Sequence, residues 1–236
     1  MGAMNMDYLY LVEQILLDGE AAVAEYQQSP GGSAANTIYA LAKLGLRTGF
    51  VGAVGNDRAG RALLRDFANA GVAVSQIKIK KRANTGAALC LSDSQGKRSL
   101  YISPGANNKL FWQDIQLEYI NQAKFLHLSS FVHKTQFKLQ KKLVASLHPS
   151  VKVSFAPGML YTVKGLRQLA PLLKRTHILF LNQVELRQLT GKGVRQGVEK
   201  CLEQGCSIVV VTSGKGRIRL TAGGRSKAAV CYIRDS

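Results

Sequence analysis

Two adjacent glycines begin the segment of this chain whose residue types best suit ligand binding. Gly31 and Gly32 are followed by Ser33, two alanines and Asn36. A helix that begins after residues without side chains lets a ligand approach its unpaired backbone N–H groups closely. Such a helix end can accept an anion or the hydroxyl groups of a sugar. The same double glycine is also typical of an ordinary tight turn before a helix.

A second polar pair follows an apolar run. Asn182 comes directly after Leu181, and Glu185 stands three residues further on. At the carboxyl end of a strand, an amide and a carboxylate one helical turn apart can order Mg²⁺-bound water beside phosphates. The alternative is a capping box, in which the Asn182 side chain caps a helix and the Glu185 carboxylate reaches back to the first N–H.

The chain carries a large positive charge. Its 32 Lys and Arg residues and 14 Asp and Glu residues give a formal net charge of +18. This balance favours an anionic partner, and a phosphorylated small molecule would suffice. Nucleic acid is a less favoured partner, because only Lys78 to Arg82 cluster and no RNA-binding aromatic signature accompanies them. The other interpretation of this cluster is a solvated basic surface.

The composition excludes several classes of protein. With 46% hydrophobic and 19% charged residues, it is typical of a globular protein, and no apolar run approaches the roughly 18 residues of a membrane span. The N-terminus lacks the features of a signal peptide, so a cytoplasmic location is expected. The four cysteines fit neither a disulfide framework nor a zinc or redox motif, and we expect buried free thiols at Cys90, Cys201, Cys206 and Cys231.

The second half of the chain alternates short apolar runs with helical stretches. Such alternation predicts a parallel sheet covered by helices. The predicted strands are 124–128, 151–155, 177–181 and 207–212, and the predicted helices are 134–147, 163–173 and 183–204, the last broken by Gly191 and Gly193.

The first half combines this pattern with β-hairpins. Ser33 and Asp57 are predicted N-caps of two helices that stop at Gly45 and Gly71, with a strand over 46–54 between them. The stretches 86–91 and 99–103 predict a hairpin, and 8–26 is a similar extended stretch. These two regions can pair into a small sheet that forms a lid over a ligand site.

Several motifs occur in an order that resembles the ribokinase (phosphofructokinase-B) family of kinases. The likeness covers essentially the whole chain. The motifs are Gly2–Asp7, the glycine run ending at Asn36, Gly55–Gly60, Thr85-Gly86, Gly96–Arg98, Pro104–Asn107, Asn182–Glu185 and Val211–Gly216.

The resemblance implies an activity and a set of site residues. Members of the family transfer the γ-phosphoryl group of ATP to a hydroxyl of a sugar, sugar phosphate or nucleoside with Mg²⁺. By position, the substrate-binding residues would be Asn5, Asp7, Gly31, Gly32 and Asn36. The nucleotide would be bordered by Asn182, Thr212, Gly214 and Gly216, with Glu185 near the metal through water. The implied fold is a three-layer α/β/α ribokinase-like fold with a mostly parallel central sheet and a small β-lid.

One family motif is absent from the sequence. In relatives a Gly-Ala-Gly-Asp segment supplies an anion hole and the catalytic base. The last residues, Asp235-Ser236, resemble those just before that motif, so the expected base lies beyond Ser236 and no catalytic residue is assigned. Loss of a general base typically lowers a rate by ~10²–10⁴-fold. We therefore expect this polypeptide alone to turn over poorly.

We expect a single ribokinase-like domain over residues 1–236, C-terminally incomplete, with lid strands within about 7–30 and 84–103. The resemblance also implies a homodimer that pairs through the lid. Besides a sugar kinase, the motifs fit a nucleoside kinase of the adenosine type, and a non-catalytic ligand-binding or regulatory module is the alternative from another class.

Overall fold

The computed structural model describes residues 1–213 and 217–222, and it divides the chain into two compact units. The first unit comprises Met1–Ile115 and Phe131–Gln136. The second comprises Gln116–Ser130 and the chain from Phe137 onward. The prediction of a single domain stays a prediction, and each unit is described by itself.

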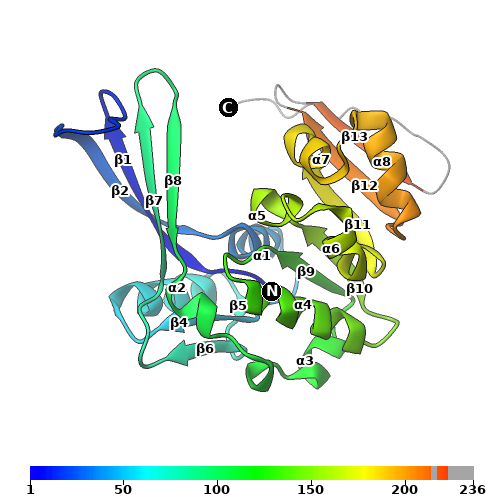
Figure 1. The fold of residues 1–236 in the computed structure, drawn as a ribbon. Coiled ribbons are helices and arrows are strands. Elements are labelled where there is room, and N and C mark those ends of the chain that lie inside the picture. Colours follow the sequence, from blue (N-terminus) through cyan, green and yellow to red (C-terminus); the bar gives the residue numbers. More distant parts are fainter. Residues whose placement is uncertain (214–216, 223–236) are drawn as a thin grey trace. The chain divides into compact units, whose positions relative to one another are not determined.

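A four-stranded sheet is the most prominent feature of the first unit (Figure 1). Its order is β2-β1-β7-β8; β1 pairs antiparallel with β2 and parallel with β7, and β8 pairs antiparallel with β7. The predicted hairpin and the pairing of the two β-rich regions are therefore confirmed. The bounds are β1 (Asn5–Val12), β2 (Val23–Gly31), β7 (Gly86–Asp93) and β8 (Arg98–Ser103).

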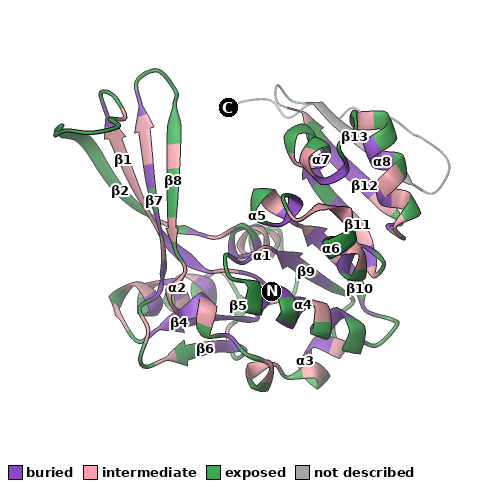
Figure 2. Cartoon of the chain, in the orientation of Figure 1, coloured by how far each residue is buried: buried purple, intermediate pink, exposed green. Residues whose placement is uncertain are grey.

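Helices and short strands support the base of this sheet. The core joins the beginning of β1, through Met4 and Met6, to Ile38 of the first long helix and to Leu63 and Phe67 of the second. Figure 2 shows that burial is concentrated here, whereas β2 is exposed along most of its length. The elements are α1 (Ser33–Lys43), β3 (Thr48–Gly49), β4 (Gly52–Gly55), α2 (Arg58–Asn69), β5 (Val72–Ala73), β6 (Ile77–Lys80), η1 (Gly105–Lys109) and η2 (Trp112–Asp114).

Two local predictions for this unit need correction. The predicted strand 46–54 is two short strands, β3 and β4, separated by Phe50 and Val51. Ser33 is not the N-cap of α1, because Gly32 holds that position with a φ of 103°. A Cβ on Gly32 would lie 2.4 Å from the carbonyl oxygen of Ala3, so both the backbone conformation and the close approach require glycine there.

The predicted N-cap of α2 is confirmed. Oδ1 of Asp57 accepts a hydrogen bond from the Gly60 N–H at 2.8 Å. The same carboxylate also accepts bonds from the hydroxyl and the backbone N–H of Thr85, both at 2.6 Å. Asp57 therefore ties the beginning of α2 to the residue directly before β7.

The second unit contains a parallel sheet with helices, as predicted, and one additional antiparallel strand. Its order is β13-β12-β11-β10-β9, and β9 to β12 are parallel, with β13 antiparallel at the edge. Strands β9 to β12 lie within two residues of their predicted positions, and β13 was not predicted. The elements are α3 (Leu117–Asn121), β9 (Phe125–Ser129), α4 (Lys134–Ser146), β10 (Lys152–Ala156), α5 (Gly158–Thr162), α6 (Gly165–Leu173), β11 (Thr176–Asn182), α7 (Gln183–Thr190), α8 (Val194–Glu203), β12 (Ile208–Ser213) and β13 (Arg217–Ala222).

The cysteines of the described residues are buried. Cys90, Cys201 and Cys206 are buried free thiols, as expected, and Cys231 lies outside the described residues. Burial raises the pKa of both Cys201 and Cys206 to about 12, which keeps these thiols protonated. Among the described residues, no helix has the length and apolar character that a membrane crossing requires.

Candidate functional site

The beginning of β1 carries the first two predicted substrate-binding residues. Asn5 lies between Gly31 of β2 and Gly86 of β7 in the sheet register. It is buried, and its Oδ1 accepts a hydrogen bond from Nδ2 of Asn107 at 2.9 Å. The Oδ1 of Asn107 in turn accepts from the N–H of Met4 at 3.0 Å. Asn5 is thus held rigidly, and its substrate role stays a prediction.

The Asp7 carboxylate has hydrogen-bonding capacity that the described residues do not use. Its carboxylate is half-buried, and the buried Oδ1 has no hydrogen-bond partner among the described residues. Burial raises the pKa of Asp7 above its ordinary value of 3.8, and the charge of Arg98 opposes this rise. Asp7 also packs directly against Gly31, because a Cβ built there would lie 2.2 Å from the carboxylate atoms. Only a glycine at position 31 leaves room for this carboxylate.

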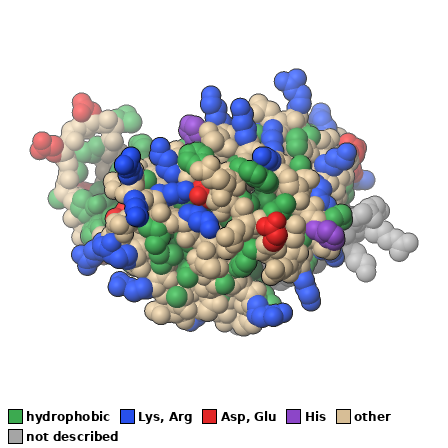
Figure 3. Space-filling model, turned by 90° about the horizontal axis from the view of Figure 1, so that it is seen from below, with side chains coloured by type: hydrophobic (Ala, Val, Ile, Leu, Met, Phe, Trp, Pro, Cys, Tyr) green, Lys and Arg blue, Asp and Glu red, His purple; other side chains and the backbone are tan. Residues whose placement is uncertain are grey.

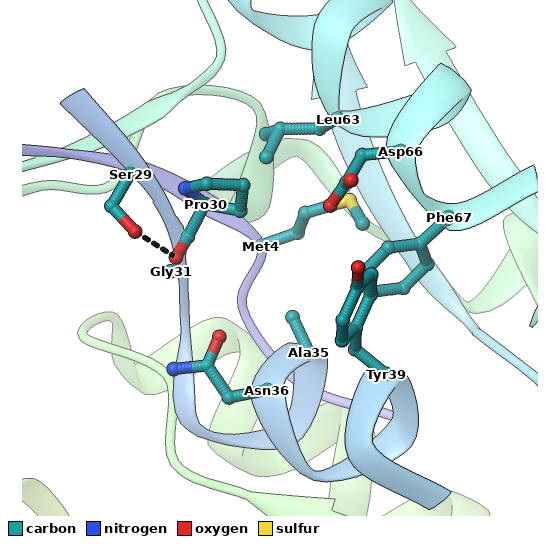
Figure 4. Close-up of a pocket in the computed structure, with 10 residues that line it drawn as sticks. All are labelled: Met4, Ser29, Pro30, Gly31, Ala35, Asn36, Tyr39, Leu63, Asp66 and Phe67. Atoms are coloured by element: carbon teal, nitrogen blue, oxygen red, sulfur yellow. Dashed lines mark hydrogen bonds between the residues drawn. The ribbon is translucent and has the colours of Figure 1, made fainter. Parts of the chain in front are cut away.

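A cavity of about 270 Å³ adjoins these residues (Figure 4). Gly31 and Asn36 are the predicted site residues that line it, whereas Asn5, Asp7 and Gly32 do not. Its apolar floor includes Met4, Leu63 and Phe67, which are almost fully buried.

The polar groups at this cavity come from two helices. Figure 4 shows the Tyr39 hydroxyl of α1 and the Asp66 carboxylate of α2 facing the same space. Neither residue was predicted to be part of a site. Their helices were predicted, but the packing that brings Tyr39 beside Asp66 leaves no signal in the local pattern.

Predicted nucleotide-side residues meet at the carboxyl edge of the five-stranded sheet. Asn182 ends β11 and pairs in register with Thr212 near the end of β12. The Asn182 side chain accepts from the Glu185 N–H at 2.8 Å, and Glu185 Oε2 accepts from the Asn182 N–H at 3.0 Å. The capping-box alternative is therefore confirmed as geometry. Gly214 and Gly216 lie outside the described residues.

Asn182 and Glu185 leave one carboxylate oxygen that can serve Mg²⁺. The capping box uses one oxygen of the Glu185 carboxylate, and the other can order water, as the prediction of an indirect contact requires. In the described part of the chain, no three His, Cys, Asp or Glu side chains gather to hold a metal ion directly. The residues present therefore fit a water-mediated contact to a nucleotide-bound cation rather than a closed metal site.

Basic side chains are dispersed rather than gathered. On the face shown in Figure 3, Lys and Arg lie scattered among apolar and uncharged side chains, with few acidic ones. Within the Lys78 to Arg82 cluster, Lys80 is bound by Asp114, with Nζ 2.7 Å from Oδ2. This cluster is therefore partly structural.

Comparisons with known proteins agree with this geometry. Residues 1–227 match the pfkB family of carbohydrate kinases. The chain is 33% identical over 177 residues, 74% of its length, to an uncharacterized sugar kinase of Archaeoglobus fulgidus. It is 32% identical over 189 residues, 80% of its length, to an ATP-dependent ribose-1-phosphate kinase of Halopiger xanaduensis. These alignments span 69% and 62% of the two relatives' own lengths.

Solved structures show the same fold. The ribokinase of Thermotoga maritima matches 99% of this chain, over 77% of its own length, with a TM-score of 0.86 at 23% identity. The ribokinase of Arabidopsis thaliana complexed with ribose and ATP matches 98%, over 76% of its own length, with a TM-score of 0.81 at 26% identity. The predicted ribokinase-like, three-layer α/β/α fold class is thereby confirmed. The chain belongs to the pfkB family of carbohydrate kinases, which are ATP-dependent phosphotransferases that act on sugar hydroxyls.

Proposed function

We propose that this protein transfers the γ-phosphoryl group of ATP, as its Mg²⁺ complex, to a hydroxyl group of a sugar or sugar phosphate. The observation that carries the proposal is the Asp7 carboxylate. It lies against a glycine, and one of its buried oxygens has no partner among the described residues. A buried acceptor without a partner is costly unless a ligand supplies the donor. Sugar hydroxyls are donors of the required kind.

The surroundings of Asp7 support an acceptor site. Gly31 links Asp7 to the cavity that Asn36 also lines, so a carboxylate, an amide and an apolar floor lie close together. A site that binds hydroxyls with buried polar groups discriminates strongly against analogues that lack one of them. We propose that Asp7 and Asn36 select the acceptor and that the four-stranded sheet acts as the lid.

A nucleotide site is proposed in the second unit, at the carboxyl edge of its five-stranded sheet. Thr212 and Asn182 are register partners there, and ligands of open α/β sheets bind at this edge. We propose that they border ATP and that Glu185 acts on Mg²⁺ through water. When bound, Mg²⁺ would neutralise charge on the phosphates.

Calorimetry with the purified chain tests the acceptor site. Ribose, fructose, ribose-1-phosphate and adenosine are titrated into the wild type and the Asp7→Asn variant. We expect one sugar or sugar phosphate to bind, and Asp7→Asn to weaken it by about 10–100-fold, because a hydrogen bond to a charged acceptor contributes roughly 1.5–3 kcal/mol. Sugar-dependent ATP consumption is then measured for the acceptor that binds.

The matched control is Asp18→Asn, which removes the same charge from an exposed residue whose carboxylate accepts a bond from the adjacent Gly19 N–H. It should leave the dissociation constant unchanged. Equal affinity of wild type and Asp7→Asn would remove the acceptor assignment. Binding of adenosine alone would support the nucleoside kinase, and sugar binding without ATP consumption would support the non-catalytic alternative.

We also propose that a second copy of the chain covers one face of the four-stranded sheet. Tyr26, Leu89 and Tyr101 are exposed, and the register places them on one face with Tyr10. Exposed apolar side chains that share a face are typical of an interface. Light scattering should show a dimer for the wild type and for Lys97→Glu, a control at the β7–β8 turn, but a monomer for Tyr101→Glu. A monomeric wild type would overturn this proposal.

A further inference from the structure

A second cavity lies in the second unit, at the amino edge of its parallel sheet. It has a volume of about 200 Å³ and is lined by residues at or just before the beginnings of β10, β11 and β12. The proposed nucleotide residues Asn182 and Thr212 end their strands, so they belong to the opposite edge. This cavity is therefore separate from the site described above.

The lining of this cavity is cationic. Lys152, Lys174, Arg175 and His177 line it, together with Ser207, and no acidic residue does. Within the described residues, no salt bridge neutralises the two lysines or the arginine. Unpaired like charges that share a concave site repel one another and raise the local concentration of anions. The charge of this cavity is thus complementary to a bound anion, since no acidic side chain of its own lining balances it.

The backbone around the cavity is also specialised. The parallel pairing of β10 with β11 shifts register here: Val153 pairs with Thr176 and Ser154 with Ile178, which leaves His177 as the extra residue. Bulges are rare in parallel pairs, and they occur preferentially where a side chain is redirected next to a site.

Gly205 allows the backbone to pack closely against Lys174 at one wall of the cavity. Gly205 has a φ of +107°, and a Cβ there would lie 3.0 Å from the Cα of Lys174. A side chain at position 205 would therefore force the wall away from Lys174.

Arg175 is already positioned before any ligand arrives. Its Nε donates to the carbonyl oxygen of Val144 and its Nη2 to that of His148, both at 3.4 Å. A guanidinium has five N–H donors, so three remain for a ligand. A fixed fork of donors binds a tetrahedral oxyanion with little loss of side-chain entropy.

Phe125 holds two of the other lining residues. The Lys152 ammonium lies 5.9 Å from the centroid of its ring, and the His177 ring centroid lies 6.3 Å from it. Lys152 and His177 therefore share a contact with one aromatic ring, in addition to the hydrogen bonds that position Arg175.

We propose that this cavity binds a small phosphate-bearing anion. Its volume lies below the roughly 300–1,000 Å³ of pockets for drug-sized ligands, which favours a compact ion. Two lysines and one arginine can balance a doubly or triply charged phosphate or pyrophosphate. Ser207 adds a hydroxyl that can donate to a phosphate oxygen.

Calorimetry at constant ionic strength tests the proposal with orthophosphate, pyrophosphate and glycerol phosphate as probes. We expect saturable binding of at least one probe, and a loss of about tenfold or more in affinity for each of Lys152→Gln and Lys174→Gln, since 1.4 kcal/mol corresponds to a factor of ten. Both lysines are exposed, so the variants should fold, and thermal melting checks this. Preference for orthophosphate over glycerol phosphate would identify a free ion as the ligand, and the reverse a phosphomonoester.

The matched control is Lys192→Gln, an exposed lysine of the same unit that does not line the cavity. It should bind each probe as the wild type does. An equal loss in all three lysine variants would show a general effect of net charge and would overturn the proposal. Displacement of the bound phosphate by ATP would also overturn the proposal. Binding of a polynucleotide but of none of the three probes would overturn it as well.

Discussion

At the scale of single residues, Asp7 links ligand binding to stability. Burial raises the pKa of its carboxyl, which disfavours the ionised form, and one oxygen has no partner among the described residues. The ionised form therefore destabilises the folded state. Replacing Asp7 by Asn removes that charge, so we expect a variant that binds acceptor poorly yet unfolds at a higher temperature. Because solvent screens this partly exposed carboxylate, the gain should be no more than about 0.5–1 kcal/mol at pH 7.

The raised pKa of Asp7 predicts how the stability difference between wild type and Asp7→Asn changes with pH. Because the folded-state pKa of Asp7 lies above the unfolded value of 3.8, the folded protein binds the proton more tightly. The penalty is absent below about pH 3.8, grows as the pH rises and is complete above the folded pKa. Thermal melts of wild type and Asp7→Asn at pH 3.5 and pH 7 should therefore differ only at pH 7. A difference of the same size at both pH values would contradict this explanation.

At the scale of elements, the Asp57 carboxylate joins helix α2 to strand β7. Burial alone would raise the pKa of Asp57, but the hydrogen bonds from Thr85 and Gly60 outweigh it and hold the pKa below 3.8. The stabilisation is therefore present above pH 3.8 and is lost as the pH falls through the lower folded pKa. We expect Asp57→Ala to lower the free energy of unfolding by about 2 kcal/mol at pH 7, through loss of the cap and of the Thr85 bonds.

Chemical denaturation at pH 7 measures this loss, and repeating it with Asp57→Asn at pH 3 and pH 7 tests the linkage. The Asn variant should lose less than Ala, because an amide oxygen can still cap the helix. Asp66→Asn, which removes another carboxylate from α2, is the control. If Asp57→Ala unfolds like the wild type, the connection between α2 and β7 contributes nothing measurable.

Elements were predicted better where their cause is local. The apolar runs of the second unit and the breaks at Gly191 and Gly193 place β9 to β12, α7 and α8 to within two residues, because a buried parallel strand and a helix stop both leave a signal in the neighbouring sequence. The two-residue strand β5 leaves no such signal, and β6, although it alternates Ile and Lys, was interpreted only as part of a basic cluster. Nor is there a local signal for the Asn5–Asn107 bond and the Tyr39–Asp66 pocket, which join segments far apart in the chain.

At the scale of the whole molecule, the charge of +18 is the dominant property. Like charges repel one another in the compact state, and salt screens this repulsion over a Debye length of about 10 Å at 0.1 M. We expect the melting temperature to rise as NaCl increases from 0.02 to about 0.3 M. Phosphate at equal ionic strength should raise it further in the wild type, and less so in Lys174→Gln. A melting temperature that falls with NaCl would show that attractive pairs dominate instead.

The position of β1 in the sheet order has a consequence for synthesis. The strand lies between β2 and β7, so the start of the chain finds its second neighbour only after Gly86–Asp93 has left the ribosome. Until then the β1 side of the nascent β1–β2 hairpin is an unpaired edge, and such edges pair readily with other chains. Polypeptides released before Gly86 should therefore aggregate, whereas in those released after the β7–β8 hairpin has emerged, β7 can pair with the β1 edge.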